Sequence, residues 1–340
     1  MAGRWVKRLA KVLAYLVLAL IVIAALAITF TVGWRPIIGA KARPLTDRRF
    51  EATPERLKRG EYLVRAVTGC LFCRSAQDEK SSDVPVLVGS EGAGRVFVES
   101  GKVLVVAPNI TPDPETGIGK WSDDAIARAI REGISADGRP LVPIMGYEEF
   151  RPLSDEDLAA VVVYIRSLPR AHNVLPRTNL PFPLSRVIHM FPQPVTAPMP
   201  QPDLSTPVKR GEYLTQIGRC RACHTPRTPP PMIQRIVGME LAGGSVFEEG
   251  VASANITPDA SGIGYYDEAL FLQVLRTGHV KARRLKVMPW WEYRNMTDED
   301  LKSVFAYLRT VKPVQHRVDN REPPTLCRLC RHKHGFGDRN

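Results

Sequence analysis

An internal repeat is the feature of this sequence that most constrains its fold. Two stretches contain, in the same order, an RGEYL pentapeptide, a C-x-x-C pair, an NITPD pentapeptide, a GIG tripeptide, a methionine and a DEDL tetrapeptide. These motifs begin at residues 59, 70, 109, 117, 145 and 155 in the first repeat, and at 210, 220, 255, 262, 288 and 298 in the second. Such self-similarity predicts two copies of one small domain, each of about 110 residues.

Each repeat is expected to open and close with a helix. Thr53 and Thr206, each followed by proline, are typical N-caps of the opening helices. Ser154 and Thr297, each with aspartate three residues later, predict the closing helices. Apolar residues at helical spacing follow these two caps: Leu158, Val161, Val162, Ile165 and Leu168, and Leu301, Val304, Phe305, Leu308 and Val311.

Prolines set the expected limits of these elements. Pro169 and Pro313 are expected to end the closing helices. A third, shorter helix is expected after Trp121 in the first repeat and after Tyr265 in the second. The many prolines between residues 171 and 205 indicate a semi-rigid linker, with a short apolar helix over residues 184–190.

Residues 12–32 form an apolar run that is long enough to cross a bilayer as a helix. A cluster of basic residues precedes the run and favours an N-terminus that stays inside while the body is exported: Arg4, Lys7, Arg8 and Lys11. A cleaved signal peptide is the alternative, since the small residues Ala25 and Ala27 resemble a cleavage site. The apolar run continues beyond that site, which favours an uncleaved anchor.

The sequence therefore predicts a membrane-attached protein with two small domains. The net charge of +12 suggests an acidic partner or an anionic membrane surface, and no nucleic-acid motif accompanies it. The expected segments are a cytoplasmic basic segment (1–11), a transmembrane anchor (12–32), a linker (33–53), the first domain (54–170), a Pro-rich linker (171–205), the second domain (206–314) and a basic Cys/His tail (315–340).

The second repeat contains C-x-x-C-H, the attachment pattern of c-type haem, at Cys220, Cys223 and His224. The two thiols would bond to the haem vinyl groups, and the adjacent imidazole would be an axial ligand of the iron. Met288 is the expected sixth ligand, because a thioether opposite histidine closes the coordination sphere and suits electron transfer. His279 is the alternative ligand, and Met296 is expected to pack in the core.

The first repeat departs from this pattern, because Arg74 follows its cysteines, Cys70 and Cys73. Arginine offers no lone pair to iron, and no histidine precedes His172. Three interpretations remain open. The domain has lost its haem and the two thiols form a disulfide; or it keeps a haem, with Met145 or a borrowed ligand on the iron; or the thiols have a redox role.

A third cysteine pair lies near the C-terminus, where Cys327 and Cys330 are followed by His332 and His334. An arginine intervenes, so the pattern is not C-x-x-C-H. A local disulfide among solvated basic residues is the preferred interpretation. A zinc site made of these four residues is an alternative, although the short histidine spacing fits a zinc finger poorly. A zinc site shared with the first cysteine pair is a further alternative.

The ordered motifs over about residues 54–314 resemble tandem class I c-type cytochromes, above all the cytochrome subunits of membrane-bound alcohol and aldehyde dehydrogenases. The resemblance implies an all-α fold, with an N-terminal transmembrane helix followed by two cytochrome c-like helical domains. It implies one haem c for each intact motif. It also implies electron relay from a dehydrogenase donor toward an oxidase or another cytochrome.

The expected function is that of an electron carrier, not an enzyme, held by a single pass in the bacterial inner membrane with its bulk in the periplasm. One alternative is a dihaem enzyme such as a peroxidase that uses an altered first haem site. Another is a docking or sensing module whose first domain holds no haem. One low-spin haem per chain would favour the carrier, and a second, high-spin haem that binds peroxide would favour the enzyme.

Overall fold

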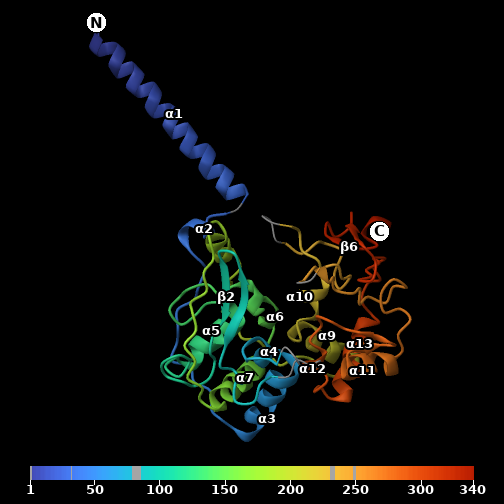
Figure 1. The fold of residues 1–340 in the computed structure, drawn as a ribbon. Helices are drawn as coiled ribbons and strands as arrows, with labels where there is room; N and C mark the ends of the chain where they lie inside the picture. Colours follow the sequence, from blue (N-terminus) through green and yellow to red (C-terminus); the bar gives the residue numbers. More distant parts are fainter. Residues whose placement is uncertain (1, 32, 79–85, 230–233, 248–249) are drawn as a thin grey trace.

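The computed structural model describes residues 2–31, 33–78, 86–229, 234–247 and 250–340, and most of its regular structure is helical (Figure 1). The α-helices are α1 (Ala2–Phe30), α2 (Arg35–Ile38), α3 (Pro54–Tyr62), α4 (Cys70–Cys73), α5 (Asp123–Glu132), α6 (Tyr147–Phe150), α7 (Asp155–Ser167), α8 (Leu184–Val187), α9 (Pro207–Ile217), α10 (Cys220–His224), α11 (Glu268–Thr277), α12 (Trp290–Tyr293) and α13 (Asp298–Leu308). Shorter helical turns are η1 (Leu63–Val67), η2 (Pro143–Met145), η3 (Ile188–Met190) and η5 (Gly337–Arg339).

Helix α1 projects from the body of the protein as one exposed helix of 29 residues (Figure 1). Among the described residues it is the one helix long and apolar enough to cross a membrane, over Gly3–Phe30. It begins well before the expected apolar run, because the basic residues ahead of the run continue the same helix. Met1 and Val32, the outer limits of the expected basic segment and anchor, lie outside the described residues.

The expected helix starts are confirmed. Four N-cap hydroxyls each accept a hydrogen bond from the backbone N–H three residues later: Thr53, Ser154, Thr206 and Thr297. The third helices, α5 and α11, and the short helix α8 are present as expected. The end of α13 differs: the N–H and hydroxyl of Thr310 both bond to the carbonyl of Tyr307, so the helix ends at Leu308. Val311 therefore lies beyond the helix, and Pro313 does not end it.

In each repeat the opening helix crosses the closing helix at a glycine. Helix α3 packs on α7, and α9 packs on α13. A Cβ atom at Gly60 would overlap the carbonyl oxygen of Ala160, and one at Gly211 would overlap that of Ser303. The glycine of each RGEYL motif therefore lets two helix backbones approach closely, which no other residue would allow.

The tyrosine of each RGEYL motif bonds to an aspartate of the other repeat, so the two repeats are joined in a reciprocal way. Tyr213 donates a 2.7 Å hydrogen bond to Asp157 of the other repeat, and Tyr62 donates one to Asp300. Each aspartate also pairs with the arginine of its own repeat, Arg59 at 2.8 Å and Arg210 at 2.9 Å. Both carboxylates are buried, so these bonds are charge-assisted and shielded from water.

Within the part of the chain that the structure describes, three antiparallel hairpins correct the all-α expectation. They pair β1 (Arg95–Ser100) with β2 (Val103–Ala107), β3 (His279–Val280) with β4 (Arg283–Arg284), and β5 (Pro324–Leu326) with β6 (Lys333–Gly335). The β1–β2 hairpin has a signal in the sequence, since two valine-rich runs flank a glycine turn at Gly101. A helical family pattern obscured that signal.

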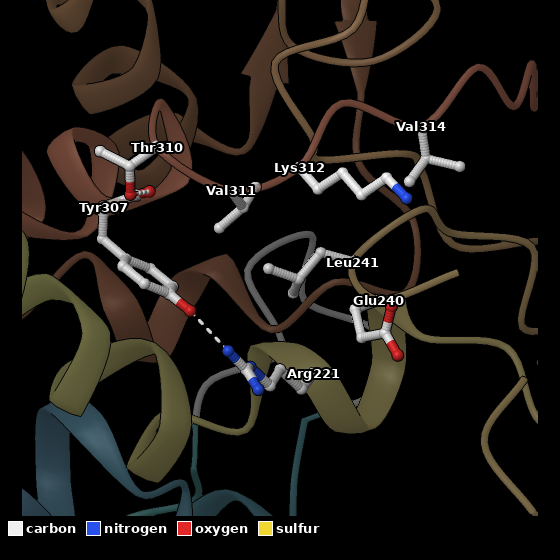
Figure 2. A pocket seen from close by; sticks show the side chains of 8 residues that line it. All are labelled: Arg221, Glu240, Leu241, Tyr307, Thr310, Val311, Lys312 and Val314. Atoms are coloured by element: carbon white, nitrogen blue, oxygen red, sulfur yellow. Dashed lines mark hydrogen bonds between the residues drawn. The ribbon is translucent and has the colours of Figure 1, made fainter. Parts of the chain in front are cut away.

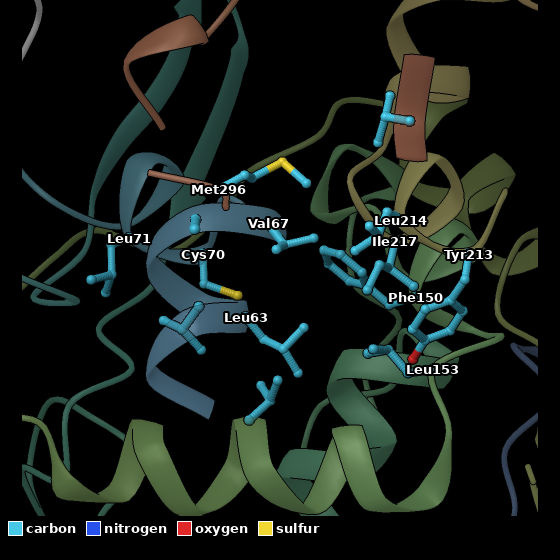
Figure 3. Close-up of a cluster of buried hydrophobic side chains, with 14 of the residues drawn as sticks. Leu63, Val67, Cys70, Leu71, Phe150, Leu153, Tyr213, Leu214, Ile217 and Met296 are labelled. Carbon is cyan, nitrogen blue, oxygen red and sulfur yellow. The ribbon is translucent and has the colours of Figure 1, made fainter. Parts of the chain in front are cut away.

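One buried apolar cluster runs through both repeats. Figure 3 shows Leu63, Val67 and Cys70 of the first repeat on one side and Leu214 and Ile217 of the second on the other. The repeats therefore share a hydrophobic core in addition to the tyrosine bonds. This shared core fixes the cysteine-bearing helices α4 and α10 relative to one another.

Candidate functional site

A large cavity lies beside the C-x-x-C-H motif of the second repeat. Its volume is about 2160 Å³, which exceeds the roughly 300–1,000 Å³ of most ligand and cofactor sites. The four haem residues expected in the second repeat border it: Cys220, Cys223, His224 and Met288. Apolar side chains of α11 and α13 form part of its wall: Phe271, Val274, Leu275, Val304 and Leu308. The fold thus gathers the expected ligands around one largely apolar space.

His224, at the end of α10, is held in the form that can ligate a metal. Its Nδ1–H donates a 2.7 Å hydrogen bond to the carbonyl oxygen of Ala254. Nε2 is then left with its lone pair, as in ligating histidines that donate their other N–H to a carbonyl. Burial lowers the pKa of His224 below its usual range, so the ring stays neutral.

The two cysteines of this motif are free thiols on the short helix α10. Burial raises the pKa of both thiols, to about 12 for Cys220, so they are protonated before any bond forms. Arg219 precedes the helix with a φ of 61°, and Gly69 precedes the equivalent helix α4 with a φ of 68°. A residue in the left-handed conformation therefore precedes both motif helices. At Arg219 this conformation is strained, because it is adopted by a residue that has a side chain.

Met288 reaches the cavity from the segment that leads into α12. Its carbonyl accepts a 2.8 Å hydrogen bond from the N–H of Trp290, which fixes the turn. Met296 is buried in the core cluster, as expected, but it also borders the cavity. His279 does not border the cavity, and its Nδ1 lies 2.7 Å from the carbonyl of Thr277.

The residues around the cavity fit a haem. Apolar walls suit the porphyrin, and the thiols and imidazole lie on one helical turn. Arg283, Arg317 and Lys281 also border the cavity and can pair with the two carboxylates that a haem carries.

A smaller pocket lies near the same motif helix (Figure 2). Its volume is about 260 Å³, below the usual range for cofactor sites. Arg221 of α10 borders it and donates a hydrogen bond to the hydroxyl of Tyr307. None of the four expected haem residues borders this pocket, so it is not the haem site.

The first repeat arranges its equivalent residues differently. Cys70 is buried in the shared core (Figure 3), with its sulfur 3.2 Å from the hydroxyl of Thr68. Cys73 instead borders the large cavity. Both are free thiols, so the disulfide of the first of the three interpretations is not present. Arg74 is buried and its guanidinium donates directly to the sulfur of Met145. Burial lowers the pKa of Arg74 from its usual value.

That arginine–methionine contact leaves no space between the two groups for an iron atom. In the second repeat, by contrast, His224 and Met288 both face the cavity. The closing helices differ in the same sense: Val304 and Leu308 border the cavity, whereas the first-repeat equivalents Val161 and Ile165 do not.

The C-terminal cysteines lie in a different setting from the expected one. Cys327 and Cys330 are buried free thiols, so a disulfide among solvated residues is not found. His332 bonds through Nε2 to the carbonyl of Arg227, 2.6 Å away. The thiols instead face His334 and His316, a residue that sequence reasoning missed. The available signal was a histidine 11 residues before a C-x-x-C-x-x-x-H run.

No protein-family model matches the chain. The chain is 29% identical to a nicotinate dehydrogenase component of Pseudomonas putida over 277 residues, 75% of this chain and 21% of the relative. It is 28% identical to the cytochrome c subunit of the quinone alcohol dehydrogenase of Gluconobacter oxydans over 281 residues, 78% of this chain and 56% of the relative. It is 29% identical to a dihaem c-type cytochrome of Cereibacter sphaeroides over 265 residues, 76% of this chain and 86% of the relative.

The chain therefore spans about a fifth and about half of the first two relatives and most of the third. Further similar proteins are the cytochrome subunits of gluconate and fructose dehydrogenases. These matches confirm the resemblance seen in the motifs. They also support haem binding and electron transport for this chain. Homologues of this chain are cytochrome c subunits of membrane-bound dehydrogenases and a dihaem cytochrome c, proteins that carry covalently bound haem c.

Proposed function

We propose that this protein is a membrane-anchored cytochrome that transfers electrons through one haem c, bound at Cys220 and Cys223 and ligated by His224 and Met288. The observation that carries the proposal is that one apolar cavity is bordered by all four residues. A chance C-x-x-C-H pattern would not be expected to face a space of that size with a methionine also bordering it.

Each of these residues has a separate task. The two thiols tether the group, the carbonyl of Ala254 orients the imidazole of His224, and burial keeps that imidazole neutral. Haem, when bound, supplies a one-electron couple, which histidine and methionine ligands place at a high potential. The apolar side chains of α11 and α13 exclude water from the cavity and so favour the less charged, reduced state.

The first repeat is proposed to hold no haem. The buried contact between Arg74 and Met145 occupies the region in which an iron and its ligands would lie. The same contact argues against a peroxidase that uses an open iron position there. The first repeat instead contributes half of the shared core and of the reciprocal tyrosine bonds, so its role is to support and present the haem domain.

The placement of the protein follows from α1 and the proposed cofactor. Helix α1 is proposed to anchor the chain in the bacterial inner membrane with the two repeats in the periplasm, where c-type haem is used. The dehydrogenase names of the relatives support a dehydrogenase as electron donor. An oxidase or another cytochrome is the proposed acceptor. The net charge of +12 favours acidic docking surfaces on those partners.

Counting haems in matched cysteine variants tests this proposal. The full chain, matured in a host that attaches c-type haem, is compared with Cys220→Ser and Cys70→Ser by intact mass and a haemochrome assay. One covalent haem is expected in the wild type and in Cys70→Ser, and none in Cys220→Ser. A haem lost from Cys70→Ser would overturn the single-haem assignment, and a colourless wild type would overturn the cytochrome assignment.

A further inference from the structure

Four buried side chains outside the haem cavity converge near the C-terminus. His316, Cys327, Cys330 and His334 each place one nitrogen or sulfur atom within 4.8 Å of all the others. All four are at most 1% exposed. Nε2 of His316 and Sγ of Cys327 are 3.4 Å apart. A tetrahedral zinc ion with bonds of about 2.0–2.3 Å has ligand–ligand edges of about 3.3–3.8 Å, so a small contraction of this cluster suffices.

Both imidazoles are oriented to offer Nε2 to the centre of the cluster. Nδ1 of His316 lies 2.8 Å from the carbonyl oxygen of Ala242, and Nδ1 of His334 lies 3.0 Å from that of Gly335. Each carbonyl accepts a hydrogen bond from Nδ1–H, so the proton is on Nδ1 and the lone pair is on Nε2. Nε2 of His334 is buried and has no hydrogen-bond partner. A buried nitrogen without a partner is costly unless something binds it.

The backbone is shaped around this cluster. The N–H of Cys327 bonds to the carbonyl of His332 and the N–H of Arg331 bonds back to Cys327, which closes a tight loop around the thiols. Arg331 adopts a φ of 61°, a conformation that is rare for a residue with a side chain. A Cβ atom at Gly244 would lie 2.7 Å from the ring of His316 and 3.2 Å from Sγ of Cys330. A strained backbone residue, Arg331, and a close backbone approach, at Gly244, therefore both lie beside the four side chains.

We propose that these four residues form a structural zinc site, which binds Zn²⁺ through two thiolates and two imidazoles. Binding would release the two thiol protons to solvent and form two Zn–S and two Zn–N bonds, with no change of oxidation state. Cysteine and histidine are the ligand types that zinc selects, and four protein ligands leave no position open for catalysis. This inference is independent of the haem proposal.

The site ties the C-terminal segment to the loop that follows the haem motif. The carbonyl of Ala242 accepts the hydrogen bond from Nδ1 of His316, and the next residue, Gly243, donates its N–H to the carbonyl of His224. Residues 317–322 of the C-terminal segment border the haem cavity. Zinc would therefore hold this segment in place as one wall of that cavity, in a stretch with few buried apolar side chains of its own.

Two histidines that lie two residues apart provide a matched test. The full chain is purified in detergent as wild type, His334→Ala, His332→Ala and Cys327→Ser, each after reduction, incubation with Zn²⁺ and dialysis. Zinc is counted per polypeptide by elemental analysis. About one zinc per chain is expected in the wild type and His332→Ala, and much less in His334→Ala and Cys327→Ser. The rate of tryptic cleavage within residues 317–340 should rise on the order of tenfold or more in the latter two.

Three outcomes would overturn the zinc site. These are a wild type that retains no zinc after this treatment, equal zinc in all four proteins, or a Cys327–Cys330 disulfide mapped in protein isolated from cells. Because zinc is counted against polypeptide, a colourless protein that holds one zinc would refute the cytochrome assignment and leave this site standing.

Discussion

Replacing Gly211 by alanine tests the helix crossing that positions the haem motif. A Cβ atom there would overlap the carbonyl oxygen of Ser303 and lie 2.8 Å from Cβ of Tyr307, where ordinary contact begins at 3.4 Å. Because a backbone carbonyl cannot swing aside, α9 would have to withdraw from α13 by about 1 Å.

The cost of that withdrawal can be estimated from two opposing effects. Overpacking of this kind costs typically 1–3 kcal/mol, and the rigid obstacle places this case at about 3 kcal/mol. Alanine is favoured over glycine within a helix by about 1 kcal/mol. We therefore expect Gly211→Ala to lower the free energy of unfolding by about 2 kcal/mol.

The assay is chemical unfolding of the haem-loaded full chain in detergent, followed by far-UV circular dichroism and haem absorbance. Glu212→Ala, at an exposed position of the same helix, is the control and should change the free energy by less than about 0.5 kcal/mol. If Gly211→Ala matched the control or were more stable than the wild type, the close crossing of α9 and α13 would be refuted.

Three further changes probe the ligand, the interface and the pH response. Met288→Ala should remove the red-end absorbance of methionine ligation and lower the reduction potential, whereas Met296→Ala should retain both; the reverse result would transfer the ligand role. Tyr213→Phe should reduce unfolding free energy by about 1.5–3 kcal/mol, because Asp157 loses a charge-assisted bond, and an unchanged value would refute the interface. Burial raises the pKa of Glu292 to about 8, so its folded form holds a proton that the unfolded form loses near its usual value of 4.5. Stability should fall as pH rises between those values, and Glu292→Gln should flatten that slope in unfolding measured at pH 5 to 9.

The helices could be predicted because their signals are local. A hydroxyl before an apolar stripe with helical spacing fixes a helix start, and all four N-caps of the opening and closing helices were predicted correctly. The end of α13 was predicted too late. Thr310 bonds back to the carbonyl of Tyr307 and ends the helix before Pro313 is reached. The β1–β2 hairpin was not predicted, because the resemblance to helical cytochromes took precedence over the strand signal of its valine-rich runs.

The C-terminal cluster shows a different limit of sequence reasoning. The spacing of Cys327, Cys330 and His334 drew attention to a metal site, but the neighbouring His332 was counted as the fourth residue. Only the folded chain shows that His332 faces Arg227 and that His316, outside the motif, completes the set. Partners that are distant in sequence depend on tertiary packing, which a local pattern does not encode.

Restoring the missing histidine of the first repeat tests whether the C-x-x-C-H motif is sufficient for haem attachment or whether the surrounding fold must also provide space. Arg74→His would complete C-x-x-C-H there, and Met145, which the Arg74 guanidinium contacts, would be the available sixth ligand. A haem also needs space, and at the equivalent positions the structure shows this space beside the second repeat only. Phe271, Met296 and Val304 border the cavity, whereas the first-repeat equivalents Ile126, Leu153 and Val161 are buried in the core and do not border it.

Because opening such a core would expose much apolar surface, we expect Arg74→His to carry one haem per chain, as the wild type does. Intact mass of protein from a maturation-competent host gives the count. The matched variant Arg74→His with Cys220→Ser should carry none. A mass increase equal to a second haem in the single variant would show that the histidine alone decides loading, and that the packed core of the first repeat yields to the cofactor.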